Sequence, residues 1–394
     1  MTTLDELRHE PNALARQYRR FDVANRLLLT GHSHQAWPDV ALEGQIEAFT
    51  DASVAVDEKW ERAFAKADLV RAGFRALLDD PAGDIALGAS THDLVIRFLS
   101  AVDLPRRPRL VTTDGEFHTL RRQLARLGEE GVEVVRVPAA PADTLAERLA
   151  AEITARTAAV LVSSVLFETS RIVPGIGELA EACERGGTEL LVDAYHALGV
   201  LPVSVREQGL GSTWITGGGY KYLQLGEGNC VLRLPPHAAS LRPVVTGWFA
   251  EFDDLAAKAS GLVGYAPGAG RFAGSTYDPT SNYRAARVFA FFAEQGLTPE
   301  LLRAVSLHQT ELLVERFDAL DAPPETITRD RSAPRAAYGG FLALRSPRAG
   351  ELQRKLAERG VSTDSRGDHL RFGPAPYLSD AQLATAVATL GELL

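Results

Sequence analysis

The sequence predicts an α/β protein with a mainly parallel sheet, followed by a smaller α+β unit. Short, apolar, β-branched runs alternate with longer helical patterns through the middle of the chain. These runs are apolar on both faces, which is typical of strands covered by helices on both sides. After about Tyr277 the alternation gives way to a long helical stretch and then to short strands and helices. At 394 residues the chain is long enough for two domains.

Six runs in the first part of the chain have the length and composition of strands. They cover residues 109–113, 132–137, 158–163, 189–193, 213–216 and 230–234. Helical patterns fill most of the gaps, for example at 120–127, 144–153 and 176–185. Ligands of such sheets bind at the carboxyl ends of the strands, so we expect the functional site there.

The last third of the chain has a different pattern. A helical stretch at 283–320 is followed by a strand at 341–344, a helix at 351–359, strands at 361–365 and 370–372, and a helix from Asp380. The first thirty residues carry no strong strand pattern and are expected to pack on this unit. We therefore predict a large domain over 31–280 and a small domain formed by 1–30 and 281–394.

Composition narrows the class of protein. A net charge of −9 without a basic cluster argues against nucleic-acid binding. Two cysteines, Cys183 and Cys230, are too few for a disulfide framework and suit a reducing compartment. The N-terminus lacks the pattern of a secretory signal, and no apolar run has the length of a membrane span. We expect a cytoplasmic protein that acts on a small molecule.

One lysine stands apart from the others. Only five of the 42 Lys and Arg residues are lysines, and four of them, Lys59, Lys66, Lys258 and Lys355, lie in helical patterns. Lys221 instead follows a strand-like run and three glycines, and it lies between two tyrosines. A lysine in such a turn can lose its proton and form a Schiff base. The simpler alternative is a surface lysine in a loop.

Asp193 makes the reactive interpretation of Lys221 more specific. It ends the apolar run at 189–193, where a carboxylate is costly unless a cation is bound next to it. A protonated pyridine nitrogen is such a cation, and a lysine one strand later could carry the aldehyde of the same ring. This pairing is typical of pyridoxal phosphate (PLP) enzymes. The alternative is that Asp193 caps the following helix.

Five segments carry a resemblance to a known family. They are Val-Asp-Ala-Tyr-His-Ala at 192–197, Gly-Tyr-Lys-Tyr-Leu at 219–223, Gly-Trp-Phe at 247–249, Arg-Phe-Ala-Gly-Ser-Thr at 271–276, and the run from 363 to 373. In this order the chain resembles fold-type I, class V aminotransferase-like PLP enzymes, and most of all kynureninase, from about Gly31 to Tyr377. The resemblance implies PLP as the cofactor and the seven-stranded sheet of that fold.

The resemblance also implies roles for individual residues. Lys221 is expected to anchor PLP as a Schiff base and Asp193 to hold the ring nitrogen, and the adjacent Tyr220 is a candidate proton carrier. Further cofactor contacts are expected from His196 near the phenolic oxygen, Phe117 stacked on the ring, and Ser90, Thr91, Tyr222, Trp248, Ser275 and Thr276 at the phosphate. The last two are expected to come from a second subunit, which implies a homodimer with shared sites. Simpler alternatives exist for Ser90 and Thr91 (a helix cap), Phe117 (core) and Trp248 (packing).

Substrate contacts are expected from Arg371, whose planar guanidinium suits an α-carboxylate, and from His32 and Ser33. The alternative for Arg371 is a surface ion pair. The chain departs from kynureninase in two places. Residues 31–35 read Gly-His-Ser-His-Gln instead of Gly-Asn-Ser-Leu-Gly, and Leu120 replaces an aspartate three positions after the stacking phenylalanine. We expect both positions at the site, where they affect substrate choice more than cofactor binding.

The resemblance implies a kynureninase-like hydrolytic cleavage of the Cβ–Cγ bond that releases alanine. A C–S or other β-lyase, a class V aminotransferase and a scaffold without activity remain alternatives. A desulfurase that uses a cysteine nucleophile is disfavoured, because Cys183 lies in a helical pattern and Cys230 in a buried-strand pattern. No metal site is expected, because His32 and His34 have no partners at metal-site spacing.

Overall fold

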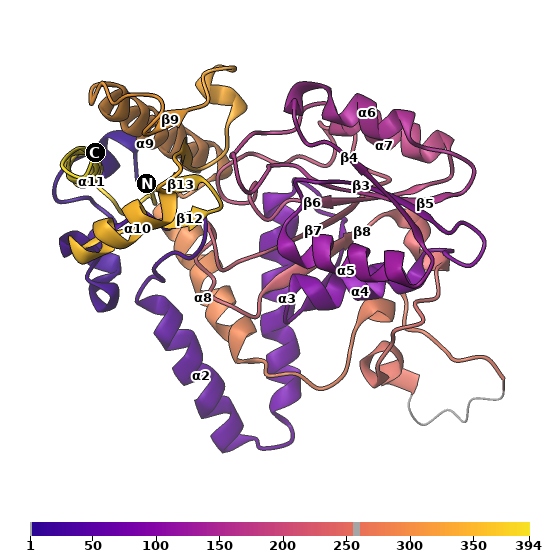
Figure 1. Ribbon diagram of the computed structural model, residues 1–394. Coiled ribbons are helices and arrows are strands. Elements are labelled where there is room, and N and C mark those ends of the chain that lie inside the picture. Colours follow the sequence, from indigo (N-terminus) through magenta and orange to yellow (C-terminus); the bar gives the residue numbers. More distant parts are fainter. Residues whose placement is uncertain (1, 255–260) are drawn as a thin grey trace.

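A seven-stranded sheet forms the centre of the larger part of the molecule (Figure 1). The computed structural model describes residues 2–254 and 261–394. The strands are β2 (Asp84–Gly88), β3 (Arg109–Thr113), β4 (Glu133–Val137), β5 (Thr157–Ser163), β6 (Glu189–Asp193), β7 (Trp214–Gly218) and β8 (Cys230–Leu234). Their order is β2-β8-β7-β6-β5-β3-β4, and β8 runs antiparallel to both of its neighbours while the other pairs are parallel. The predicted mainly parallel α/β sheet is confirmed.

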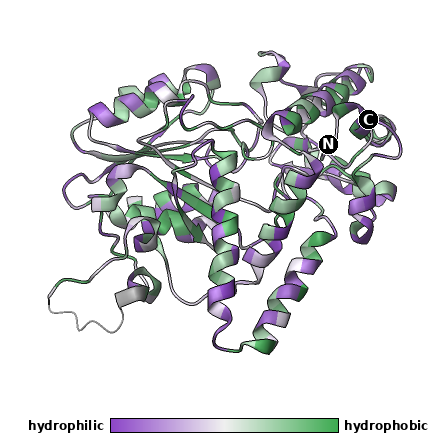
Figure 2. Cartoon of the chain, turned by 180° about the vertical axis from the view of Figure 1, so that it is seen from behind, coloured by the Kyte–Doolittle hydropathy of each residue, from purple (hydrophilic) through white to green (hydrophobic). Residues whose placement is uncertain are grey.

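Helices cover both faces of this sheet. Helices α4 (Thr91–Ala101) and α5 (His118–Glu129) lie on one face, and α6 (Leu145–Ala151) and α7 (Ile176–Arg185) lie on the other (Figure 1). Side chains along β6 alternate between the two layers, so that Leu191 packs with α4 and α5 while Leu190 and Val192 pack with α7. Figure 2 shows that these strands are mostly apolar, whereas the helices around them carry both hydrophilic and hydrophobic residues. Burial on both faces explains why the strands are continuously apolar.

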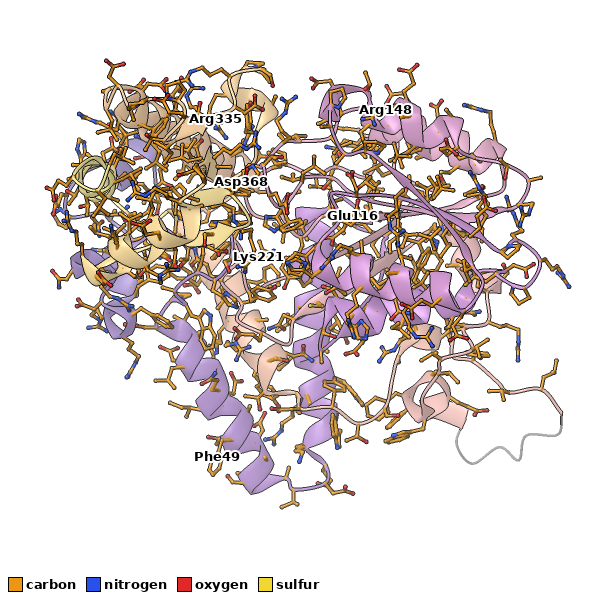
Figure 3. All side chains as sticks on the ribbon, viewed as in Figure 1. Phe49, Glu116, Arg148, Lys221, Arg335 and Asp368 are labelled. Atoms are coloured by element: carbon orange, nitrogen blue, oxygen red, sulfur yellow. The ribbon has the colours of Figure 1, made fainter. Side chains whose placement is uncertain are left out.

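Three long helices extend from one side of the sheet. They are α2 (Val40–Val54), α3 (Lys59–Leu77) and α8 (Thr280–Gln295). Gly44 allows α2 to approach α8 closely, because a Cβ at this position would lie 2.6 Å from the carbonyl oxygen of Tyr283. Phe49 of α2 lies toward the far end of the α2–α3 pair, and its side chain is 78% exposed (Figure 3).

The C-terminal part forms a second, four-stranded sheet in the order β12-β13-β10-β9. Its elements are α9 (Pro299–Asp318), β9 (Thr328–Arg329), β10 (Leu342–Arg345), α10 (Ala349–Glu358), β11 (Val361–Ser362), β12 (Asp364–Arg366), β13 (His369–Phe372) and α11 (Asp380–Gly391). The helical stretch predicted at 283–320 is divided into α8 and α9. Gly296 ends α8 with a φ of 71°, and Thr298 caps α9 by accepting a hydrogen bond from the backbone of Leu301.

Several of the first thirty residues contact the C-terminal part. Strand β1 (Leu27–Leu28) pairs in parallel with β11, and the Gln382 side chain donates hydrogen bonds to the carbonyls of Val23 and Arg26. The remaining helices are α1 (Leu4–Arg8) and the short 3-10 segments Ala15–Gln17, Arg19–Phe21, Val23–Asn25, Ala142–Thr144, Pro236–Ser240, Trp248–Asp254, Gly268–Phe272 and Arg335–Ala337.

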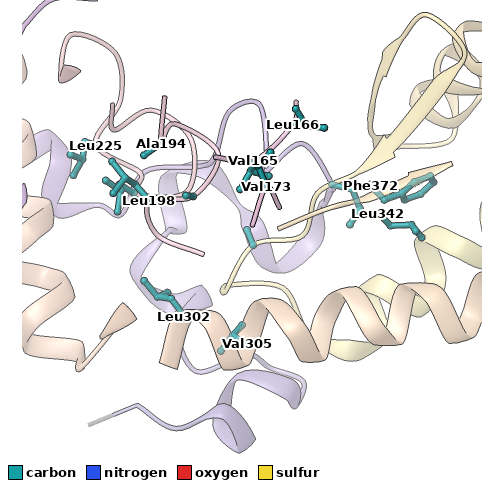
Figure 4. Close-up of a cluster of buried hydrophobic side chains, with 14 of the residues drawn as sticks. Val165, Leu166, Val173, Ala194, Leu198, Leu225, Leu302, Val305, Leu342 and Phe372 are labelled. Carbon is teal, nitrogen blue, oxygen red and sulfur yellow. The ribbon is translucent and has the colours of Figure 1, made fainter. Parts of the chain in front are cut away.

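One hydrophobic core passes from the large sheet into the C-terminal part. Figure 4 shows it where Val165 and Ala194, at the ends of β5 and β6, lie near Leu302 and Val305 of α9 and Phe372 of β13. Because this core is continuous, packing does not mark a boundary near residue 280, and the division into two domains stays a prediction. Among the described residues, no helix combines the length and apolar character needed to cross a bilayer.

Candidate active site

A cavity of about 270 Å³ opens at the carboxyl ends of the parallel strands. Its walls come from the ends of β5, β6 and β7 and from the loops that lead into α4 and α5. Its lining includes eight of the predicted residues or their neighbours, namely Ser90, Thr91, Phe117, Asp193, Tyr195, His196, Tyr220 and Lys221. The position agrees with the rule for ligands of parallel sheets.

Lys221 is buried at the centre of this cavity wall, with 5% of its surface exposed, so the surface-lysine alternative is wrong. Its Nζ lies 2.6 Å from Nε2 of His196 and 4.8 Å from the ring centre of Tyr195. Figure 3 shows it between the large sheet and the C-terminal part. Burial lowers the pKa of the Lys221 ammonium to about 7, although Asp193 acts in the opposite direction. The amine is therefore partly neutral near pH 7 and can act as a nucleophile or a base.

The other described lysines lie on helices, as predicted. Lys59 and Lys66 belong to α3 and Lys355 to α10, where Lys66 pairs with Glu47 and Lys355 with Glu351. Lys258 lies outside the described residues.

Asp193 is buried at the end of β6 and has no cationic side chain in an ion pair among the described residues. One of its oxygens, Oδ1, accepts a hydrogen bond of 2.8 Å from the backbone N–H of Tyr195. This contact closes a local turn, and no α-helix follows Asp193, so the helix-cap alternative is wrong. Burial raises the pKa of the Asp193 carboxyl, while the Tyr195 N–H and Lys221 act against this rise. A cation bound in the cavity, such as a pyridinium nitrogen, would satisfy this carboxylate.

Aromatic side chains form one wall of the cavity. Phe117 precedes α5, and its ring meets the ring of Phe167 edge-on at 5.4 Å. Both residues line the cavity, so Phe117 is not a closed core residue. His196, opposite, is buried, and its Nδ1 has no hydrogen-bond partner among the described residues. Burial and the neighbouring Lys221 charge lower the pKa of His196, which keeps its ring neutral.

The N-terminus of α4 lies at the same cavity. Ser90 caps this helix, because its Oγ accepts from the N–H of Asp93 at 3.1 Å. The cap uses only one backbone N–H of the first turn, so the others are available for an anion. Thr91 also lines the cavity and donates to the sulfur of Cys230 at 3.6 Å. Ser90 is therefore a helix cap, as the alternative states. This role leaves the other backbone N–H groups of the first turn available to a phosphate.

Arg371 lies in a second cluster, which does not line the 270 Å³ cavity. It is 3% exposed, so the surface ion-pair alternative is wrong. Its Nη1 donates to the carbonyl of Phe167, and its Nη2 donates to Asp364. Its Nε is buried and has no partner in the part of the chain that the structure describes. Phe167 thus connects the two clusters, because its ring lines the cavity and its backbone carbonyl accepts a hydrogen bond from Arg371.

His32 belongs to this second cluster. Its ring is buried, with Nε2 3.7 Å from a carboxylate oxygen of Asp364 and the ring centre 4.6 Å from that of Phe341. Burial lowers the pKa of His32 to about 3, so the ring is neutral. Ser33 is only half-buried, and its hydroxyl pairs with His34 at 3.2 Å instead of facing the cavity.

Several expected residues lie away from the cavity in this single chain. Trp248 is 43% exposed, and Ser275 and Thr276 are exposed as well. Tyr222 is buried beside Gly340, and its hydroxyl has no partner among the described residues.

The expectation that Leu120 faces the site is wrong. Its side chain packs in the core between α5 and the sheet, whereas Thr119 lines the cavity. The helix begins at His118, and its periodicity turns position 120 toward the sheet.

The sequence reasoning missed Glu116 and Ser163. Ser163 ends β5 and lines the cavity, and the buried Glu116 carboxylate accepts its hydroxyl at 2.6 Å. A signal was available, because both residues follow or end parallel strands, as Asp193 does. Cys230 also lines the cavity, and burial raises the pKa of its thiol.

Two comparisons with known sequences show what this chain is similar to. Residues 302–390 match the family model described as the kynureninase C-terminal domain. A Bacillus subtilis (strain 168) protein described as the uncharacterized aminotransferase YcbU is 24% identical over 95% of this chain and 96% of its own length.

Solved structures share the fold. A mutant of C-DES with glycine covalently linked to its PLP cofactor has a TM-score of 0.80 at 18% identity, over 96% of this chain and 98% of that one. The cysteine desulfurase of Thermococcus onnurineus NA1 has a TM-score of 0.80 at 16% identity, over 100% and 98% of the two chains. The fold expected from the resemblance is confirmed. A further match is the cystine C–S lyase C-DES with its product cysteine persulfide, at a TM-score of 0.80 and 18% identity over 95% and 99%.

Proposed function

We propose that this chain is a PLP-dependent enzyme that acts on an amino acid, with Lys221 as the covalent anchor of the cofactor. The observation that carries the proposal is that one cavity holds a partly neutral lysine and a buried carboxylate that has no ion pair among the described residues. The PLP-linked C-DES structure, which shares the fold, supports it. PLP, when bound, withdraws electrons from the Cα of an amino acid attached to it.

The residues around the cavity fit the parts of this cofactor. Asp193 would hold a proton on the ring nitrogen, and Phe117 would lie against the ring. Nε2 of the neutral His196 lies 2.6 Å from Nζ of Lys221, and His196 would bond an oxygen of the ring near the anchored aldehyde. The first turn of α4, with Ser90 and Thr91, suits the phosphate.

Two side chains near the anchor are placed to move protons. With the cofactor bound, the Lys221 amine would be the group that accepts a proton from the substrate Cα, because its lowered pKa leaves it partly neutral near pH 7. The Tyr220 ring lies 5.8 Å from the same nitrogen. Burial raises the pKa of Tyr220 to about 12, so its hydroxyl stays a proton donor.

The substrate carboxylate is assigned to Arg371. Its guanidinium is fixed by Asp364 and the Phe167 carbonyl, and its Nε has no partner among the described residues. His32 and Ser33 remain proposed substrate contacts, with the neutral His32 ring the better placed of the two.

We assign hydrolytic Cβ–Cγ cleavage with release of alanine as the first reaction to test. The match to the kynureninase C-terminal domain supports it, because the matched segment contains Arg371 and Asp364. The fold shared with the C–S lyase C-DES favours a β-lyase as the second candidate. A cysteine nucleophile is not supported: Cys183 and Cys230 are buried, and burial raises the pKa of the Cys183 thiol to about 12.

A second copy of the chain completes the proposed site. Ser275 and Thr276 are exposed here, and apolar side chains near them are exposed as well: Val244, Val245, Trp248, Phe252, Leu262 and Val263. Exposed apolar groups of this kind are typical of subunit interfaces. Sedimentation of the PLP-loaded protein at several concentrations measures its oligomeric state directly. A monomer at every concentration would contradict the shared site.

The deciding experiment is a product screen with the PLP-loaded protein. Alanine released from kynurenine or 3-hydroxykynurenine supports the hydrolase. Release of pyruvate and a thiol or persulfide from cysteine or cystine moves the assignment to a β-lyase, and keto-acid formation that depends on an acceptor moves it to an aminotransferase. Lys221→Ala serves as the inactive control and Lys355→Ala as the matched surface control.

A further inference from the structure

A second buried carboxyl lies behind the cavity wall, and the function proposed above does not use it. Glu116 follows β3 and is 1% exposed (Figure 3). It accepts three hydrogen bonds, from the Thr113 hydroxyl at 2.7 Å, the Ser163 N–H at 3.1 Å and the Ser163 hydroxyl at 2.6 Å. Among the described residues it has no ion pair with a basic side chain.

The hydrogen bonds fix where a proton on Glu116 must lie. The Thr113 hydroxyl accepts from the Gly115 N–H at 3.1 Å, so its own hydrogen points to Oε1 of Glu116. Oε1 also accepts from the Ser163 N–H, which leaves no room for a proton there. In the part of the chain that the structure describes, Oε2 has the Ser163 hydroxyl as its one partner. A protonated Glu116 therefore carries its proton on Oε2 and donates it to Ser163.

The direction of the Ser163 hydroxyl follows from this. When Glu116 is ionised, Ser163 donates its hydrogen inward to Oε2 and offers the cavity only lone pairs. When Glu116 is protonated, Ser163 accepts from it, and its own hydrogen is free to point into the cavity. Because Ser163 pairs in register with Asp193 on the next strand, this change occurs beside the proposed ring-nitrogen partner.

The groups around Glu116 place its change of protonation near neutral pH. Burial raises the pKa of Glu116 to about 7, with Asp193 on β6 adding to the rise and the Ser163 and Thr113 hydroxyls acting against it. Asp193 is the charged group that faces Glu116 from the neighbouring strand, and Lys221 is the cation next to it. On the loop of Glu116 itself, Asp114 accepts from the Ala139 N–H and His118 pairs with Arg121, and both side chains are exposed.

We propose that Glu116 is a positioning residue that acts through Ser163, switching the hydroxyl at the cavity surface between donor and acceptor. The proposal rests on the PLP site proposed above. A proton leaves by a balanced path: Glu116 Oε2 gives its proton to Ser163 Oγ while Ser163 gives its own to an acceptor in the cavity. The carboxylate that remains is then held by the same three donors.

The carboxyl is tested first in the protein without cofactor, by the free energy of unfolding as a function of pH. A group whose pKa is raised on folding contributes stability below its unfolded pKa, and that contribution is lost as the pH rises through the folded pKa. For Glu116 the loss spans pH 4.5 to about 7 and amounts to roughly a few hundredfold in the unfolding equilibrium. Glu116→Gln removes this loss, since the amide mimics the protonated form. An unchanged pH dependence in Glu116→Gln would overturn the proposal.

The action on the site is tested by the absorbance of bound PLP as a function of pH. We expect a midpoint near pH 7 in the natural protein, no midpoint in Glu116→Gln, and none in Ser163→Ala, where the connecting hydroxyl is gone. Thr113→Val is the matched control: it removes a donor to Glu116 but keeps Ser163, so the midpoint moves to higher pH and persists.

Two outcomes separate this proposal from the proposed function. If the stability of Glu116→Gln changes as expected but the PLP spectrum keeps its midpoint, Glu116 titrates without acting on the site and the proposal fails. If the protein does not bind PLP at all, the proposed function fails, while the stability measurement still reports on Glu116.

Discussion

The two clusters of buried charge in this protein are built differently. Around Lys221 the ionisable groups lack full ion pairs, and burial moves the pKa values of Lys221 and Glu116 to about 7. Around Arg371 the charges are paired: burial acts against ionisation of Asp364, but His32 and Arg371 hold the pKa of this carboxyl well below its usual range. The first arrangement allows protons to move near neutral pH, whereas the second keeps a fixed charge in a fixed position.

The largest effect is expected from Lys221→Ala, which removes the group that distinguishes the first cluster. Covalent PLP binding should be lost, and turnover should fall by a factor on the order of a thousand or more. Absorbance of the bound cofactor and mass spectrometry after borohydride reduction measure this loss. Retention of a reducible PLP adduct in the variant would place the anchor elsewhere.

Asp193→Asn should retain PLP but lower turnover by roughly a hundredfold or more, because a neutral amide does not hold the ring nitrogen protonated. Parallel measurement of kcat and the PLP dissociation constant separates this role from simple binding. Turnover close to that of the natural protein would exclude Asp193 as the partner of the ring.

Asp364→Asn tests the second cluster. The Arg371 charge would remain buried without its partner, which costs about 3 kcal/mol of folding free energy. We also expect KM to rise about tenfold with a smaller change in kcat, since the guanidinium is no longer fixed for the substrate carboxylate. Urea unfolding and steady-state kinetics provide the two readouts, and an unchanged KM would remove Arg371 from the substrate site.

The pH dependence of stability without cofactor tests the burial of Lys221 itself. Folding lowers the pKa of Lys221 from 10.5 to about 7, so the folded state binds fewer protons in this window and stability rises with pH across it. Lys221→Met should therefore be more stable than the natural protein at pH 7, and the difference should shrink toward pH 10. For Asp364, whose pKa is also lowered on folding, stability rises with pH as well, but only in strong acid: the stabilisation is present above the unfolded pKa and is lost as the pH falls through the folded pKa. A Lys221→Met difference that does not depend on pH would show that the amine is charged in both states.

The local sequence pattern was sufficient to predict strands that are buried on both faces of the sheet. Strands β3, β6 and β8 begin and end where the sequence predicts, because each has a central run of apolar residues whose side chains are buried on both faces of the sheet. Strand β2 was missed, since the five residues Asp84–Gly88 begin with an aspartate and end with a glycine and have no such pattern. The division between α8 and α9 was also missed, although Gly296 and the Thr298–Pro299 pair are typical helix-end and helix-start signals.

By itself the sequence determined the mainly parallel sheet and singled out Lys221 and Asp193 as candidate site residues, because strand burial and the residue at a strand end are local properties of the chain. Tertiary structure alone decided which groups meet. Glu116, after β3, accepts from Ser163 at the end of the neighbouring strand β5. Arg371 donates to the carbonyl of Phe167, and Leu120 turns into the core instead of the cavity. These outcomes depend on contacts between distant segments and on the rotation of a helix about its axis, which no short stretch of sequence contains.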